Sequence, residues 1–144
     1  IKNMYETTDD PNTKRNLWGR EIYPRCMYNT LMEIKNKYRD LPVYITENGH
    51  GMYEEADENG YVVDDARIEM MQGYIDFMFK AMEDGCDVRG YYAWSSMDLY
   101  SWVNGYEKRY GLVRVDFDND NKRIPKKSYY WFKNLIEKYQ KENS

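Results

Sequence analysis

A single carboxylate stands where a short apolar run of the sequence ends. Residues 43–46 (Val-Tyr-Ile-Thr) are β-branched or aromatic and predict a strand, and Glu47 follows directly, before Asn48-Gly49. In parallel β/α architectures, residues at the carboxyl ends of strands face the ligand site. A carboxylate there can act as a nucleophile, but a Glu before Asn-Gly is also an ordinary turn residue. By its position alone, Glu47 is open to both interpretations.

A second candidate is the segment "YSWVNGYEKRYG" at residues 100–111. Within it, Ser101, Lys108 and Tyr110 supply a hydroxyl, an ammonium and a phenol. Together they can hold a phosphate, because one cation pairs with its charge and two neutral donors fix its oxygens. The alternative is a solvated surface loop, which composition alone favours. The one histidine, His50, has no partner at a telling spacing and is interpreted as a loop residue.

Composition bounds the kinds of partner that we expect. The 144 residues suit one domain, predicted to span residues 1–144 without an internal boundary. A net charge of −4 and a pI near 5.1 disfavour a nucleic-acid partner. No apolar run approaches the ~18 residues of a membrane span, and no metal-ligand spacing or cofactor motif occurs. Cys26 and Cys86 are predicted to be two buried thiols in a reducing compartment.

Three amphipathic helices and two strands must position the candidate groups. Asp64 or Asp65 is predicted to cap the second helix, and Ser128 the third. The apolar faces of the three helices are predicted to be Met27, Leu31, Ile34 and Tyr38; Ile68, Met71, Ile75, Met78 and Met82; and Tyr129, Phe132, Leu135, Ile136 and Tyr139.

The strands and the chain ends complete this prediction. Residues 88–95 predict the second strand, residues 112–117 a short strand of a hairpin, and the tail from residue 141 is predicted to fray. The order helix, strand, helix, strand, hairpin, helix predicts an α/β fold with parallel βα units. The chain begins with Ile1, without an initiator Met or the apolar region of a signal peptide, so we expect it to be part of a longer protein.

Four motifs resemble glycoside hydrolase family 1: "VYITENG", "YYAWSSMD", "SWVNGYEKRYGLVRVDF" and "RIPKKSYYWF". The resemblance covers nearly the whole chain and begins with "WGREIYP" at residue 18. The family folds as a (β/α)8 TIM barrel and hydrolyses β-glycosides with retention. The resemblance therefore implies that the chain is the C-terminal quarter to third of such a barrel, including its seventh and eighth strands.

The resemblance assigns roles to two of these residues. Glu47, in the TENG motif, corresponds to the nucleophile that attacks the anomeric carbon and forms a glycosyl-enzyme intermediate. Trp94 corresponds to the tryptophan that forms the floor of the sugar subsite. The family's acid/base Glu lies in an Asn-Glu-Pro motif, which this chain lacks. We therefore expect the isolated chain to be inactive, and to self-associate or pair with the missing N-terminal part of the barrel.

The segment after Trp94 resembles the 6-phospho-β-glycosidase branch of the family. Members that act on unphosphorylated sugars usually carry Glu where this chain has Ser101, and the pattern Ser101, Lys108, Tyr110 is similar to the phosphate ligands of the branch. Trp102 resembles a residue of the 6-phospho-β-galactosidases that contacts the axial 4-hydroxyl region. The implied substrate is a phosphorylated disaccharide or aryl glycoside. Such substrates arise from phosphotransferase uptake, which implies a bacterial cytoplasm.

Two other functions stay open at this point. The chain can be a catalytically inactive phosphosugar-binding or interaction fragment, because the acid/base motif is missing. It can also belong to an ordinary β-glucosidase for neutral sugars, which Ser101 argues against. The resemblance leaves the choice between 6-phospho-β-glucosidase and 6-phospho-β-galactosidase open, and it implies no cofactor.

Overall fold

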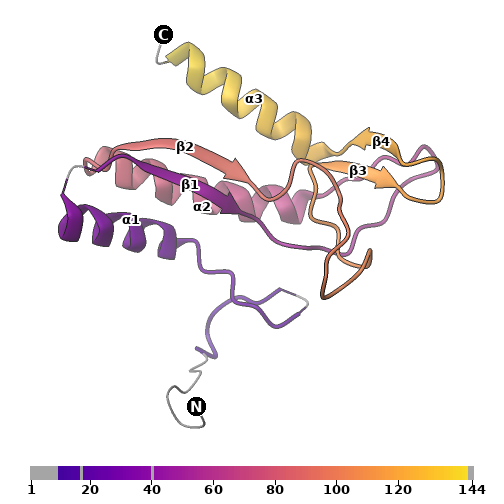
Figure 1. Ribbon diagram of the computed structural model, residues 1–144, viewed down its shortest axis with the longest axis horizontal. Helices are drawn as coiled ribbons and strands as arrows, with labels where there is room; N and C mark the ends of the chain where they lie inside the picture. The colour runs from indigo at the N-terminus through magenta and orange to yellow at the C-terminus, as the bar shows by residue number, and fades with distance from the viewer. Residues whose placement is uncertain (1–9, 17, 40, 143–144) are drawn as a thin grey trace.

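The computed structural model describes residues 10–16, 18–39 and 41–142 (Figure 1). The elements occur in the predicted order: α1 (Arg25–Tyr38), β1 (Val43–Asn48), α2 (Asp65–Glu83), β2 (Val88–Ala93), β3 (Val113–Asp116), β4 (Lys122–Pro125) and α3 (Lys127–Glu142).

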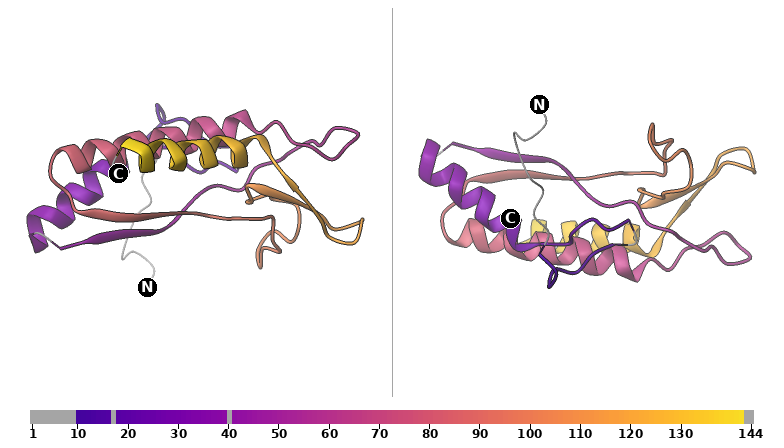
Figure 2. Two further views of the ribbon diagram at one scale, coloured as in Figure 1. Left: turned by 90° about the horizontal axis from the view of Figure 1, so that it is seen from above. Right: turned by 90° about the horizontal axis from the view of Figure 1, so that it is seen from below.

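β1 and β2 form a parallel pair, as predicted, in which Val43 lies opposite Val88 and Asn48 opposite Ala93. The helices lie on one side of this pair, and its other side carries no helix (Figure 2). The antiparallel β3–β4 hairpin lies beyond the carboxyl ends of both strands (Figure 1). Because the two strands run in the same direction, the loops that follow them meet at one end of the molecule.

The core lies between the strand pair and the helices and is built mainly on α2. Met71, Ile75 and Met78 of the predicted apolar face are buried, so the methionine stripe is core. The buried residues of the two core clusters are Leu31, Ile75, Met78, Ala81 and Cys86, and Met70, Met71, Tyr74 and Leu112. Burial of apolar surface, at about 25 cal/mol per Å², is the main source of their stabilisation.

Some boundaries and burial predictions were wrong. β1 runs two residues further than predicted, so Glu47 lies within the strand and not after it. Tyr38, placed on the apolar face of α1, is 62% exposed because the last turn of α1 lies at the margin of the molecule (Figure 1). α3 continues to Glu142 where fraying was expected, and residues 143–144 lie outside the described part. Cys86 is buried as predicted, but Cys26, in the first turn of α1, is exposed.

The caps of α2 and α3 also differ from the prediction. Asp64 precedes α2 but makes no side-chain cap hydrogen bond to it. Its carboxylate instead accepts from the backbone N–H of Ser128 at 2.9 Å and from the Ser128 hydroxyl at 2.6 Å. The backbone N–H of Ser128, which has no acceptor within the first turn of α3, thus donates to a carboxylate 64 residues earlier in the chain. Ser128 is the second residue of that helix and donates to the cap.

The face of the strand pair that carries no helix is rich in exposed aromatic side chains. Tyr44 is 52% exposed and Tyr92 is 58% exposed. In the described residues β2 pairs only with β1, so its other edge is open.

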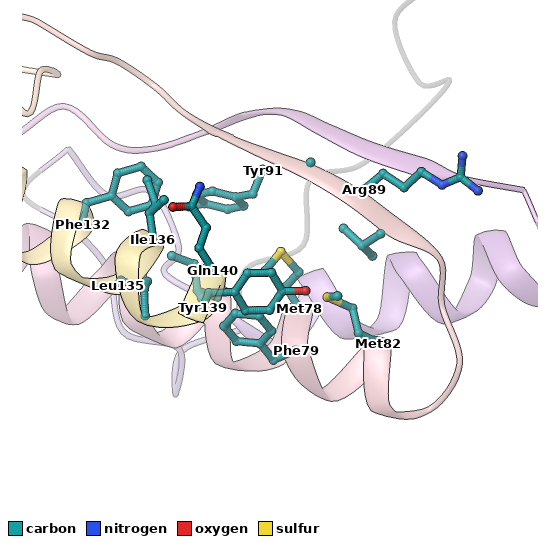
Figure 3. Close-up of a pocket in the computed structure, with 13 residues that line it drawn as sticks. Met78, Phe79, Met82, Arg89, Tyr91, Phe132, Leu135, Ile136, Tyr139 and Gln140 are labelled. Atoms are coloured by element: carbon teal, nitrogen blue, oxygen red, sulfur yellow. The ribbon is translucent and has the colours of Figure 1, made fainter. Parts of the chain in front are cut away.

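An apolar cleft of about 370 Å³ lies between β2, α2 and α3, lined by residues such as Met78, Tyr91 and Leu135 (Figure 3). No helix of the described part is long and apolar enough to cross a membrane.

Open strand edges and exposed aromatic faces drive association between chains. We expect the purified chain to self-associate with rising concentration, as measured by light scattering. Replacing both tyrosines, Tyr44→Lys and Tyr92→Lys, should shift the distribution towards monomer, because like charges then oppose face-to-face contact. Tyr38→Lys, at an equally exposed tyrosine on α1, is the matched control and should leave association unchanged. A wild-type chain that is a monodisperse monomer at all concentrations would contradict this expectation.

Candidate active site

A cleft of about 780 Å³ lies at the carboxyl ends of β1 and β2. All six residues that the sequence singled out line it: Glu47, Trp94, Ser101, Trp102, Lys108 and Tyr110. They come from β1, from the end of β2 and from the long loop before β3. The structure therefore brings together two groups of residues that are about fifty positions apart in the sequence.

The ends of β1 and β2 place Glu47 next to the Trp94 segment. The Trp94 backbone N–H donates to the carbonyl of Asn48 at 2.9 Å, which joins the two strand ends. A Cβ on Gly49 would lie 1.9 Å from the Trp94 carbonyl oxygen, so only glycine permits this close approach. The Trp94–Ser95 peptide bond is cis. Both side chains are exposed to the cleft, where a carboxylate and an indole ring can contact the same ligand.

The loop that follows folds back on itself at Ser101. Ser101 and Gly105 exchange two backbone hydrogen bonds of 2.8 Å each. The Ser101 hydroxyl accepts from the backbone N–H and the side-chain amide of Asn104, at 3.3 and 3.2 Å. Both bonds use the oxygen as acceptor, so its O–H can donate to a ligand. Trp102, at the tip of this turn, is 95% exposed at the rim of the cleft.

Gly51 allows Lys108 and Tyr110 to pack against the loop after β1. A Cβ on Gly51 would lie 2.9 Å from the Tyr110 ring and 3.0 Å from the Cβ of Lys108. Met52 and Arg109 exchange two backbone hydrogen bonds of 2.9 Å beside it. The loop after β1 and the candidate phosphate loop are therefore one ordered unit and not two independent solvated loops.

Arg67, in the first turn of α2, holds this unit from beneath. Its guanidinium is 1% exposed and donates to the carbonyls of His50 and Tyr110 at 3.0 Å each, and of Arg109 at 2.9 Å. It also pairs with Asp64 at 2.9 Å and with the Glu54 carboxylate. One side chain thus satisfies carbonyls from both loops of the cleft.

A buried lysine extends this ion cluster towards β3. Lys126 is fully buried and pairs with the Glu54 carboxylate and with Asp98 at 2.9 Å. Asp98 also accepts the Gly111 backbone N–H at 2.9 Å, and the Arg109 guanidinium lies 3.8 Å away. The charges of the cluster therefore balance: its carboxylates and its cations number three each. Charges that are buried need such pairing. The members are Glu54, Asp64, Asp98, Arg67, Arg109 and Lys126.

The charges that line the cleft suit an anionic ligand. Arg20 and Lys108 are cationic, and Glu47 is the one carboxylate among the described lining residues. His50 is half-buried, and desolvation, together with the Arg20 and Arg67 charges, lowers its pKa below the ordinary value. His50 is therefore neutral at pH 7 and adds no charge. The described residues contain no cluster of three or more side chains able to hold a metal ion.

Several residues of this site carry no functional signal in the sequence. Asn16, Trp18 and Arg20, from the segment before α1, line the cleft, although that segment shows no periodicity. The "WGREIYP" motif contained two of them but did not assign them a role. Arg67 and Lys126 are also buried here, and nothing local in the sequence reveals which charges will be buried. These residues join the site through contacts with segments that are distant in the sequence, so short motifs do not reveal them.

The chain belongs to glycosyl hydrolase family 1, whose sequence profile matches residues 1–141. It is similar to a solved structure of the family 1 β-glucosidase from Thermotoga maritima and to one of the β-glucosidase from Thermotoga maritima in complex with galacto-hydroximolactam. Both superpose with a TM-score of 0.84 at 36% identity and cover 90% of this chain but 29% of theirs. The predicted fold class, the C-terminal portion of a (β/α)8 barrel, is confirmed.

Curated relatives of higher identity carry a more specific name. The chain is 46% identical to the 6-phospho-beta-galactosidase of Streptococcus mutans and 43% identical to that of Leptotrichia buccalis, each over 138 residues. These alignments cover 95% of this chain. The chain spans 29% of the length of these relatives.

Removing the Arg67 charge should destabilise the chain strongly. Arg67→Met leaves Glu54 and Asp64 without their common partner, and breaking a buried pair in this way costs about 3–5 kcal/mol. Lys127→Ala removes the exposed Lys127–Asp65 pair and should cost less than about 1 kcal/mol. Urea unfolding followed by circular dichroism measures both. Equal unfolding midpoints for the two variants would show that the cluster does not hold the loops.

Proposed function

We propose that the chain is the C-terminal segment of a retaining 6-phospho-β-glycosidase that carries the nucleophile and the phosphate site. The observation that supports this most is the single cleft shared by Glu47 and the group Ser101, Lys108 and Tyr110. A nucleophile beside a cation and two hydroxyl donors matches a glycoside whose sugar bears a phosphate. The barrel segment that completes the catalytic site lies outside this sequence.

In the proposed reaction, the Glu47 carboxylate attacks the anomeric carbon while the bond from that carbon to the leaving oxygen breaks. The leaving oxygen takes a proton from an acid that another part of the barrel supplies, because Asn-Glu-Pro is absent here. Water then opens the glycosyl-enzyme, and its proton returns to the same acid/base group. Trp94, exposed beside Glu47, lies under the apolar face of the sugar ring.

Recognition of the phosphate is assigned to the loop. The Lys108 ammonium pairs with the phosphate charge, while the Ser101 and Tyr110 hydroxyls donate to its oxygens. Each hydrogen bond to a charged group contributes about 1.5–3 kcal/mol. A neutral sugar leaves Lys108 without its anion, and this difference favours the phosphorylated substrate.

We further propose that the substrate is a 6-phospho-β-galactoside. Trp102 at the rim of the cleft and the names of the curated relatives support the galacto configuration. The enzyme then works in a bacterial cytoplasm, where phosphotransferase uptake delivers phosphorylated glycosides. The partner of this chain is the N-terminal part of the barrel, which covers the open β2 edge.

A β-glucosidase for neutral sugars is the second candidate function. The solved structures of Thermotoga maritima that the chain resembles are of a β-glucosidase, at 36% identity. The cationic lining of the cleft and the absence of a carboxylate at Ser101 favour the phosphorylated substrate over this alternative. An inactive phosphosugar-binding fragment would keep the same loop but would not require Glu47.

Activity should depend on both Glu47 and the substrate phosphate. The longest natural form of the protein is expected to hydrolyse p-nitrophenyl 6-phospho-β-galactoside in preference to its gluco epimer and to both unphosphorylated analogues. Glu47→Gln should lower kcat by at least about a thousandfold, because the nucleophile is lost. Glu58→Gln, at an exposed carboxylate outside the cleft, is the control and should leave kcat unchanged. Activity that survives in Glu47→Gln would refute the assigned nucleophile.

Selectivity for the phosphorylated substrate should fall when a carboxylate replaces Ser101. Ser101→Glu places a negative charge beside the phosphate and should lower kcat/KM for the phosphorylated substrate about a hundredfold, while the neutral analogue changes less. Ser96→Glu introduces the same charge at an exposed position that does not line the cleft. An equal loss on both substrates in Ser101→Glu would indicate damage to the loop and not loss of phosphate recognition.

A further inference from the structure

Three segments of the chain meet around the ammonium of Lys108. Its Nζ lies 4.1 Å from the centroid of the Trp18 ring. Trp18 is also stacked on Tyr53, with ring centroids 4.6 Å apart and an interplanar angle of 29°. The Tyr53 hydroxyl in turn donates to the carboxylate of Glu107, which precedes Lys108 in the sequence. Trp18 and Lys108 line the cleft, whereas Tyr53 and Glu107 do not.

This arrangement keeps the charge of Lys108 available. Glu107 is its nearest carboxylate in the sequence and would be an obvious ion-pair partner, but Tyr53 holds it outside the cleft. Within the described residues, Lys108 has the indole contact and no carboxylate partner. An indole face attracts an ammonium without neutralising its charge. The cation therefore stays free to pair with an anion that enters the cleft.

The contact also limits the freedom of a flexible side chain. A lysine in solvent loses considerable rotamer entropy when it is fixed on a ligand. Contact with the indole restricts Lys108 before the ligand arrives, so less entropy is lost on binding. The ammonium has three N–H donors and the ring faces only one side of it, so the other donors remain for a phosphate in the cleft.

We infer that Trp18 is a positioning residue for phosphate recognition, which holds Lys108 at the cleft wall while Tyr53 keeps Glu107 away from it. This inference rests on the proposed function, because it assumes that Lys108 binds the phosphate of the substrate. It adds a residue from the segment before α1 to the specificity of the site. Trp18 acts through Lys108 and needs no contact with the sugar.

The test measures binding of galactose 6-phosphate and of galactose by calorimetry, in the longest natural form of the protein. Trp18→Leu removes the aromatic face and should weaken galactose 6-phosphate about fivefold, with galactose affected less than twofold. Trp18→Phe keeps an aromatic face and should restore most of the difference. Trp131→Phe, at a tryptophan of α3 outside the cleft, is the matched control and should change neither affinity.

A second measurement separates positioning from a structural role. In NMR spectra, the Lys108 Cε protons should show an upfield ring-current shift that disappears in Trp18→Leu and persists in Trp131→Phe. Selectivity that stays at the wild-type value in Trp18→Leu would overturn the inference, as would equal losses for both sugars. Failure of the proposed function itself looks different, because the wild-type protein would then bind galactose 6-phosphate no more tightly than galactose.

Discussion

The buried guanidinium of Arg67 is the interaction on which the geometry of the cleft depends. It donates to backbone carbonyls of both loops at the carboxyl ends of β1 and β2 and pairs with Asp64 and Glu54. The Arg109 and Tyr110 carbonyls also accept from the backbone N–H groups of Met52 and Ser95, so the guanidinium adds a second donor to each of them and also reaches the His50 carbonyl. Burying a carbonyl of irregular backbone without any partner would be costly. A planar fork with five donors suits this task, whereas lysine has three donors on a single atom. Arg67 therefore joins both loops to α2, in addition to the backbone hydrogen bonds that join the loops to each other.

The same cluster connects the cleft to the outer helices. Asp64 pairs with Arg67 and also caps α3, so the position of that helix and the position of the loops share one carboxylate. Lys126, just before α3, reaches Asp98 after β2. In a barrel, strand ends are positioned by the helices that pack outside them. Here buried ion pairs supplement apolar packing, because Arg67 and Lys126 join the loops to the residues that flank α2 and α3.

The family 1 relationship gives this arrangement its functional meaning. A barrel segment that holds the proposed nucleophile and the proposed phosphate ligands contains the groups that recognise one sugar ring, while the proton donor belongs elsewhere. In a complete (β/α)8 barrel every strand pairs on both edges, whereas the described β2 pairs only with β1 and leaves an apolar cleft beside α2 and α3 (Figures 1 and 3). In this proposal the segment carries the nucleophile together with the phosphate ligands, and only the proton donor comes from another part of the barrel.

The sequence by itself determined the element order, the buried face of α2, the parallel pairing and the six candidate residues that meet in the cleft. The predicted faces of α1 and α3 hold only in part, because Tyr38, Tyr129, Ile136 and Tyr139 are exposed. Periodic apolar positions and short motifs are local signals, so they can be read along the chain. Tertiary structure alone decided that Asp64 caps α3, that Arg67 and Lys126 are buried, and that Trp18 lies against Lys108. Each of these contacts joins residues that are between 3 and 90 positions apart in the sequence, and the packing of the elements brings them together. Burial of a charge follows from its surroundings in space and leaves no local mark in the sequence.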